Sequence, residues 1–317
     1  MKIILFWTNK PNSDTYFRDA WRSSELKFSP FHELVIESHR KIGNDVELWT
    51  YQNVSEPPAG IKIKDASTIM SYDTAHMALM NGHSIAHIAD AIRLKRASQV
   101  EGVVLDMDAV VLKKFPEHDS WFATMPSKKT GGFAPQWGKN KPPMKVHDNS
   151  WDGKELTAFP IKVGPNTKQQ VNDLADWIIE KLKTDPKNSS DEWNSVLWTV
   201  KKICSTDTTA KVYQPIYFCP LPAWLGEGKC YSMESPSRLD GKTELFGHTM
   251  PSIDEIAEKS FTVQHFFESA WNKADSISKR EWNNLALDSL IRKEYDYIFN
   301  NTKIETTQIS SLEKFFA

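Results

Sequence analysis

SIAHIADAIRLKRASQVEGVVLDMDAVVLKKF, residues 84–115, is the stretch of sequence that decides the fold. Its first half has the three- and four-residue spacing of an amphipathic helix with one buried stripe. Ser84 stands where a helix N-cap belongs, and Gly102 ends the periodic pattern. The residues that define the stripe are Ile85, Ile88, Ala89, Ile92 and Arg96.

The second half of this stretch predicts a buried strand that ends in two acids. The run VVLDM, residues 103–107, is rich in valine, as are strands covered on both faces of a sheet. It leads into Asp106 and Asp108, whose carboxylates would repel each other and are costly to remove from water. A divalent cation would compensate that charge, and hard oxygen ligands suit Mg²⁺ or Mn²⁺.

Length and composition place the chain among globular α/β proteins. Its 317 residues are 40% hydrophobic and 11% aromatic, enough for one large α/β domain. The net charge of −2 argues against a protein that binds nucleic acid by bulk electrostatics. The three cysteines do not have the spacing of a zinc site or a disulfide framework. With no signal peptide or membrane span recognised, the expectation is a cytoplasmic protein.

Strands and helices alternate along the first 115 residues, which predicts a mostly parallel sheet. Trp7 and Thr8 lie at the carboxyl end of the first strand, where α/β sheets place ligand-contacting residues. Before the central stretch, the expected elements are a strand at 2–8, a helix at 31–42, a strand at 46–51 and loop with a short helix at 66–81.

The second half of the chain is less regular. Residues 126–149 are rich in Lys, Gly and Pro and predict a long loop. Loops of this length often serve as lids, and one interpretation of this loop is a lid on the acceptor side. The remaining expected elements are an edge strand at 121–125, strands at 157–164, 211–224 and 261–266, and helices at 167–183, 191–203, 252–259 and 279–299.

Three segments resemble the DXD glycosyltransferases. The central pattern is A-D-x-x-R at residues 89–93, followed by G-x-x-L-D-x-D at 102–108. H-x-x-x-S-x-W at 265–271 is similar to a late segment of these enzymes, and ILFWT at 4–8 to the end of their first strand. The likeness is to the families that include fungal initiating α-mannosyltransferases, capsular-polysaccharide-type transferases and the glucosyltransferase domains of large clostridial toxins.

The resemblance implies a single GT-A-like domain over residues 1–317. Residues 1–125 would form the nucleotide-sugar-binding half, and residues 126–317 a less regular acceptor-side half with closing C-terminal helices. The implied activity moves a sugar from a UDP- or GDP-linked donor to a glycan or other hydroxyl acceptor, with retention of configuration. Polysaccharide biosynthesis is the corresponding process.

The resemblance also assigns roles to individual residues. Asp106, Asp108 and His265 would hold Mn²⁺ or Mg²⁺. Asp90 and Arg93, three apart on the helix and so on one side of it, form the implied catalytic pair at the donor sugar and diphosphate. The implied nucleotide-sugar site consists of Trp7, Thr8, Asp90, Arg93, Asp106, Met107, Asp108, Ser269 and Trp271.

Other readings of these residues stay open. Asp90 and Arg93 could be a helix-surface ion pair, and Trp7 a core residue. Glu101 and Val104 stand where the family has Gly and Tyr. The run VVLDMDAVVL also resembles the first motif of haloacid-dehalogenase-type phosphatases, with Asp106 as nucleophile. A carbohydrate-binding protein without turnover is the non-enzyme alternative.

Overall fold

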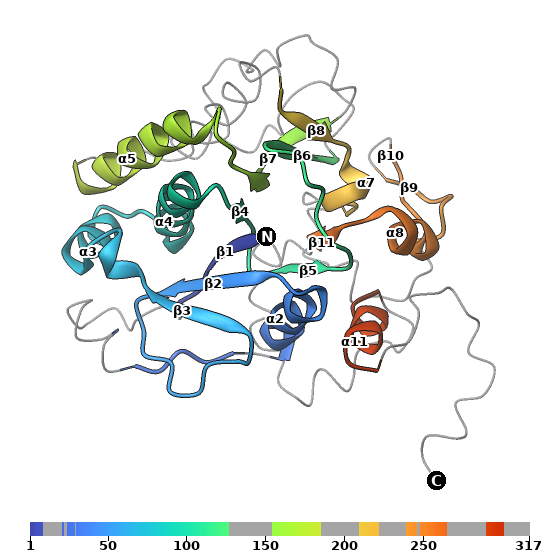
Figure 1. The fold of residues 1–317 in the computed structure, drawn as a ribbon, viewed down its shortest axis with the longest axis horizontal. Coiled ribbons are helices and arrows are strands. Elements are labelled where there is room, and N and C mark those ends of the chain that lie inside the picture. The colour runs from blue at the N-terminus through green and yellow to red at the C-terminus, as the bar shows by residue number, and fades with distance from the viewer. Residues whose placement is uncertain are drawn as a thin grey trace.

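A seven-stranded, mostly parallel sheet forms the centre of the molecule in the computed structural model (Figure 1). The strand order is β3-β2-β1-β4-β7-β6-β8, in which β7 runs antiparallel to both of its neighbours. The structure describes residues 1–8, 21, 24–28, 30–126, 154–184, 209–221, 239–245, 248–264 and 290–300. Within these ranges, the expected α/β class with a mostly parallel sheet is confirmed.

The strands of this sheet are β1 (Lys2–Phe6), β2 (Asp45–Thr50), β3 (Ile61–Asp65), β4 (Val103–Val104), β6 (Trp121–Pro126), β7 (Lys154–Lys162) and β8 (Lys211–Tyr213). Two short pairs lie outside it: β5 (Ala109–Val111) with β11 (Thr262–Gln264), and β9 (Glu244–Leu245) with β10 (His248–Thr249). The helices are α2 (Pro30–Ile42), α3 (Tyr72–Met80), α4 (Ile85–Val100), α5 (Lys168–Thr184), α7 (Pro215–Phe218), α8 (Ile253–Lys259) and α11 (Leu290–Asn300), with a 3₁₀ turn at Ala66–Thr68.

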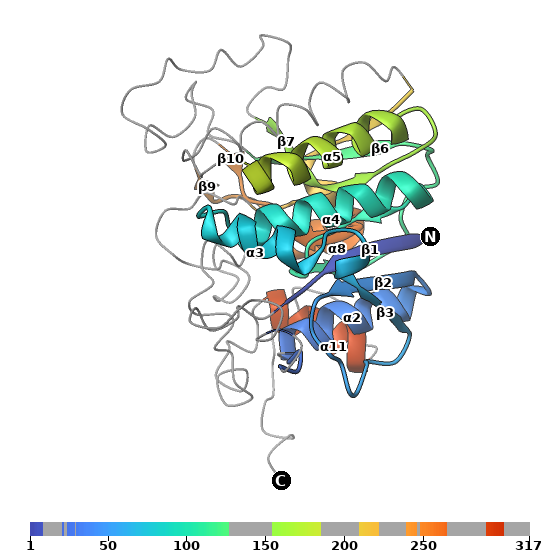
Figure 2. The same cartoon turned by 90° about the vertical axis from the view of Figure 1, so that its left-hand side faces the viewer.

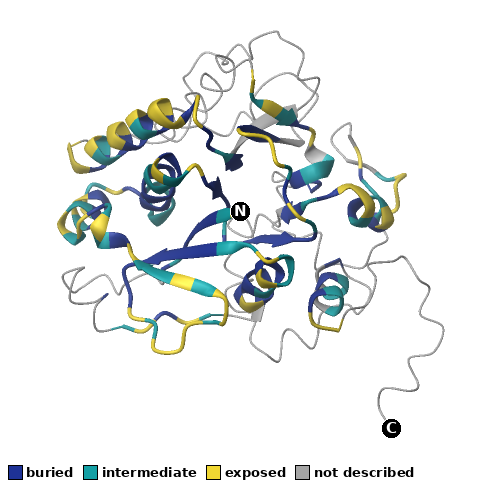
Figure 3. Ribbon diagram, viewed as in Figure 1, coloured by how far each residue is buried: buried dark blue, intermediate teal, exposed yellow. Residues whose placement is uncertain are grey.

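Helices cover both faces of the sheet. Helices α3, α4 and α5 form one layer, which Figure 2 shows side by side, and α2 lies on the other side of β1 and β2 (Figure 1). Successive residues of β1 alternate between the two layers: Ile4 packs in the cluster with Ile88 of α4, and Ile3 in the cluster with Ile36 of α2. Both surfaces of the central strands are therefore buried (Figure 3).

The predicted central helix is confirmed as α4, but Gly102 does not end it in the expected way. Glu101 closes the helix in the left-handed conformation, with φ of 55°. Gly102 instead lies against β1, where an added Cβ would come within 2.8 Å of Ile4 Cδ1. A side chain at position 102 would therefore force Ile4 to shift, and Glu101 instead adopts the left-handed conformation that glycine usually takes at the end of a helix.

The predicted strand through Met107 is wrong in its length. Strand β4 ends at Val104, and Leu105 makes one last ladder hydrogen bond from its N–H to the Ile4 carbonyl, at 3.3 Å. The Ala109 N–H then donates to the Asp106 carbonyl at 3.3 Å, which closes a turn before β5 begins. The two acids consequently lie on a turn between two strands.

Elements whose place depends on distant pairing differ most from expectation. Strand β6, expected at an edge, lies between β7 and β8. The segment at 211–224, expected to hold a strand interrupted by prolines, begins with the short strand β8, and α7 follows from Pro215. Strand β3 was not expected, although Ile61 and Ile63 alternate with lysines. The loop at 126–149, apart from Pro126, and the helix at 191–203 lie outside the described residues.

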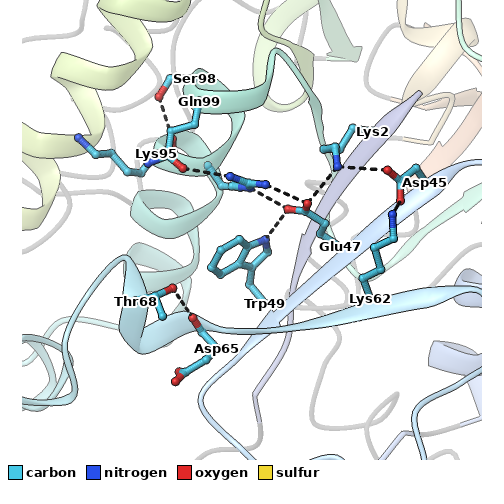
Figure 4. Close-up of polar contacts among 11 residues, drawn as sticks. Lys2, Asp45, Glu47, Trp49, Lys62, Asp65, Thr68, Lys95, Ser98 and Gln99 are labelled. Atoms are coloured by element: carbon cyan, nitrogen blue, oxygen red, sulfur yellow. Dashed lines mark hydrogen bonds and ion pairs between the residues drawn. The ribbon is translucent and has the colours of Figure 1, made fainter.

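A charged cluster fixes α4 to the amino ends of β1 and β2 (Figure 4). Glu47 accepts hydrogen bonds from Arg96 Nε at 2.8 Å and Nη2 at 2.9 Å, and from Lys2 Nζ at 3.1 Å. Trp49 Nε1 donates to the same carboxylate at 3.3 Å. Burial alone would raise the pKa of Glu47, but the hydrogen bonds from Arg96 and Lys2 lower it to about 2.

Candidate functional site

Arg93 of α4 is the centre of the candidate site. Its Nη2 donates to Asp90 Oδ1 at 2.8 Å, and its Nη1 donates to the Leu105 carbonyl at 2.7 Å and to the Asp106 carboxylate. Its Nε donates to the Ala89 carbonyl at 3.3 Å. One guanidinium thus connects a helix turn to the turn that carries the two acids.

Asp90 and Arg93 are buried, so the alternative of a helix-surface ion pair is wrong. Asp90 is 1% exposed and Arg93 4% exposed. Burial alone would lower the pKa of Arg93, but the charges of Asp106 and Asp90 raise it, so the guanidinium stays protonated. Ion pairs at this depth are costly to break, because the remaining partner is left as a buried charge.

The turn carrying Asp106 and Asp108 exposes one acid more than the other. The Asp106 side chain is 35% exposed, whereas Asp108 is 7% exposed. Between them, Met107 belongs to the core cluster that includes Leu5 and Leu105, so its side chain faces inward. Burial, and then the charges of Asp106 and Asp108, raise the pKa of the Cys219 thiol well above its usual value.

Strand β11 brings the late segment of the chain to this turn. Gln264 pairs with Ala109, the residue directly after Asp108. The next residue in the sequence is His265, the predicted third metal ligand. His265, Ser269 and Trp271 lie outside the described residues, so their assignments stay predictions.

At the carboxyl end of β1, Trp7 and Thr8 each contact a residue that the sequence did not single out. The Trp7 indole lies on the His32 imidazole, with ring centroids 4.2 Å apart and a 52° tilt. Burial lowers the pKa of His32 to about 4, so this ring is neutral near pH 7. Thr8 Oγ1 donates to Gln52 Oε1 at 2.9 Å. Gln52 follows β2 by two residues, and this position at a strand end is the signal that could have identified it.

The structure therefore brings part of the predicted set together. Asp90, Arg93 and Asp106 are joined by hydrogen bonds, and Asp108 lies on the same turn as Asp106. Trp7 and Thr8 follow β1, which pairs in parallel with β4 at the amino side of that turn. Residues 7 and 8 follow β1, and the two acids follow the neighbouring strand β4. These positions lie beyond the carboxyl ends of the strands, where doubly wound sheets bind nucleotides.

The charges at the turn suit a hard divalent cation. Arg93 contributes +1 and the three acids Asp90, Asp106 and Asp108 contribute −3, a formal sum of −2 for these four side chains. In the described ranges, no group of three or more His, Cys, Asp and Glu side chains could hold a metal ion. Mg²⁺ is often bound by only one or two carboxylates, with substrate phosphates and waters completing its shell. The two turn carboxylates fit that coordination chemistry.

Comparisons with known proteins add little to this geometry. No family model matches the chain, and no curated protein matches it. A solved structure named PaToxG Glycosyltransferase is similar at 13% identity with a TM-score of 0.36, covering 64% of this chain and 72% of that one. A likeness this distant carries no argument about activity.

Across the described ranges, no helix is long and apolar enough to cross a membrane.

Proposed function

We propose that this protein is a metal-dependent glycosyltransferase. It moves a sugar from a UDP- or GDP-linked donor to a hydroxyl group of a glycan or other acceptor, as in polysaccharide biosynthesis in the cytoplasm. The observation that carries the proposal is the buried Arg93 network, which holds Asp90 and Asp106 at the carboxyl end of β4 and, together with Asp108, has a formal charge of −2.

The proposed chemistry uses these residues in distinct ways. A nucleoside diphosphate leaves with added negative charge, and Mn²⁺ or Mg²⁺ would supply compensating positive charge when bound. Asp106 and Asp108 would be its carboxylate ligands, with His265 as the predicted third. Trp7 would stack on the base, an interaction that a partly exposed indole makes at low entropic cost.

Asp90 and Arg93 act together in this proposal. Because Arg93 is hydrogen-bonded to both Asp90 and Asp106, it would orient the Asp106 carboxylate toward the donor diphosphate. The resemblance assigns the pair to the sugar and diphosphate end of the donor. Retention is proposed from the resemblance; in such enzymes the departing phosphate can accept the acceptor's proton, so a separate base is not required.

The contacts of Asp106 favour transfer over phosphatase chemistry. A phosphatase of the haloacid-dehalogenase type would need this carboxylate as its nucleophile. In the structure, Asp106 Oδ1 accepts a hydrogen bond from a protonated guanidinium, which makes this carboxylate a weaker nucleophile.

A donor screen tests the proposal. UDP- and GDP-linked sugars are incubated with the protein and Mn²⁺, and released nucleoside diphosphate and inorganic phosphate are measured separately. We expect Mn²⁺-dependent release of UDP or GDP from at least one donor and its loss in Asp108→Asn, with Lys95→Ala as an active surface control. Release of phosphate from phosphate esters assayed in parallel would contradict the proposal, as would the absence of turnover of any donor with or without acceptors.

A further inference from the structure

Phe159 on β7 lies against the centre of the candidate site. The Arg93 Cζ is 4.3 Å from the centroid of the Phe159 ring, which places the guanidinium over the aromatic face. Phe159 is 3% exposed, so the contact is shielded from water. A cation over an aromatic face is attracted by the ring quadrupole, and more strongly where water is excluded.

The sheet register explains why this ring meets Arg93. In the antiparallel pair of β4 and β7, Val104 lies opposite Ile161. Val104, Ile161 and Phe159 all belong to the core cluster that includes Ile88 and Ile92 of α4, so Phe159 lies on the face of the sheet that α4 covers. Strand β7 therefore brings an aromatic residue beneath α4, where its ring meets Arg93.

The contacts of Arg93 occupy its edge and one of its faces. Its nitrogen atoms donate along the edge to Asp90, Asp106 and the Leu105 carbonyl. Phe159 covers one face of the guanidinium. The hydrogen bonds lie in the plane of the guanidinium, so they resist tilting out of that plane least. The ring thereby limits the motion that would carry the guanidinium away from Asp106.

We propose that Phe159 is a positioning residue, which acts through Arg93 to hold the Asp106 carboxylate in place for a metal–nucleoside diphosphate. The consequence for ligand binding rests on the proposed function; the effect on Arg93 does not. Residues that orient metal ligands typically change metal affinity about 10- to 100-fold when they are replaced.

Two variants separate the ring's electrostatics from its volume. Phe159→Leu keeps an apolar side chain and removes the aromatic face. Incorporation of 3,4,5-trifluorophenylalanine at position 159 keeps the ring and weakens the negative potential of its face. Phe122→Leu is the matched control for lost core packing, because Phe122 on β6 is 1% exposed and belongs to the same core cluster as Phe159.

The first measurement needs no ligand. In ¹⁵N spectra of the arginine side chains, with the Arg93 signals assigned from Arg93→Lys, the rotation rate of its guanidinium is measured in each protein. Because a cation–π contact shielded from water contributes about 2 kcal/mol, we expect rotation at least about tenfold faster in Phe159→Leu, an intermediate rate with the fluorinated ring, and the wild-type rate in Phe122→Leu. Equal rates in wild type and Phe159→Leu, or equal changes in both leucine variants, would overturn the inference.

The second measurement is the affinity for Mn²⁺ with UDP or GDP, by calorimetry well below the unfolding temperature. We expect Phe159→Leu to bind about 10-fold more weakly and Phe122→Leu to bind as wild type does. Unchanged affinity in Phe159→Leu would overturn the positioning role. Should wild type bind no metal–nucleotide, the proposed function fails, and the spectra still decide whether Phe159 positions Arg93.

Discussion

Helix α4 carries two arginines three residues apart, and each is paired with a buried carboxylate near a different end of the sheet. Arg96 meets Glu47 beside the amino ends of β1 and β2, with Lys2 and Trp49 donating to the same carboxylate. Arg93 meets Asp90 and Asp106 beyond the carboxyl end of β4. Glu47 is surrounded by donors from the protein itself, whereas Arg93 is shared between two acids.

The two clusters differ in the sign of their charge. Lys2, Lys62 and Arg96 with Asp45 and Glu47 sum to +1, whereas Arg93 with Asp90, Asp106 and Asp108 sums to −2. A carboxylate matched by protein donors contributes to stability and has no need of a ligand. An excess of partly buried acids is more often found where a cation binds. The difference separates a structural cluster from a candidate site on one helix.

Replacing Arg93 with Met should have the largest effect on stability. The substitution removes the cation that Asp90 and Asp106 share and leaves Asp90, which is 1% exposed, without it. We expect the free energy of unfolding to fall by about 3–5 kcal/mol in urea denaturation. Arg96→Met should cost less, because Lys2 and Trp49 still donate to Glu47. Equal losses would contradict the distinction between the clusters.

Glu47→Gln tests the structural cluster through pH. The folded pKa of Glu47 is about 2 against its ordinary 4.5, so its ionised form stabilises the fold above pH 4.5, and this is lost as pH falls toward 2. A shift of that size corresponds to about 3 kcal/mol. We expect wild type to lose about 2 kcal/mol more stability than Glu47→Gln between pH 6 and pH 3, measured by denaturant unfolding, because the rest of the contribution is lost only as the pH falls below the folded pKa of about 2. Parallel pH profiles would show that Glu47 does not contribute in this way.

Lys95, between the two arginines, measures what an exposed pair on α4 contributes. Its Nζ lies 2.6 Å from Asp176 Oδ1 of α5, with the Asp176 side chain 54% exposed. Solvent screens such a pair, so Lys95→Ala should lower the free energy of unfolding by only about 0.2–1 kcal/mol. A double-mutant cycle with Asp176→Ala gives the coupling free energy between the two side chains. A coupling free energy as large as the loss expected for Arg93→Met would contradict the claim that buried ion pairs on α4 contribute more than exposed ones.

Asp108→Asn should have the smallest effect on stability. It removes one acid from a cluster with excess negative charge and keeps the size of the side chain. We expect the free energy of unfolding to change by no more than about 0.5 kcal/mol without metal, or to rise. A loss of several kcal/mol would mean that Asp108 is a structural acid like Glu47.

Local patterns predicted much of the structure of residues 1–125. The spacing that ends at Arg96 predicted α4, and α2 ends at Ile42 before Gly43, whose φ is 77°. These features depend on neighbours a few residues away, which a sequence displays directly. Within α4, spacing also placed Asp90 and Arg93 on one side of the helix.

The missed features depend on segments far apart in the chain. Phe159 meets Arg93 because β7 pairs with β4 beneath α4, and β6 is internal only because β8 pairs with it. His32 contacts Trp7 because α2 packs beside the end of β1. The burial of Asp90 likewise follows from tertiary packing, because an ion pair between residues i and i+3 has the same sequence spacing on a buried helix as on an exposed one.

The most direct test of the account is calorimetric titration of UDP and GDP into the protein with Mn²⁺, with Mg²⁺ and with EDTA, in wild type and Asp108→Asn. The account predicts binding of at least one nucleotide to wild type with the metal, and binding at least about 10-fold weaker with EDTA or in Asp108→Asn. Metal-independent binding of equal strength in both proteins, or no binding of either nucleotide, would contradict it.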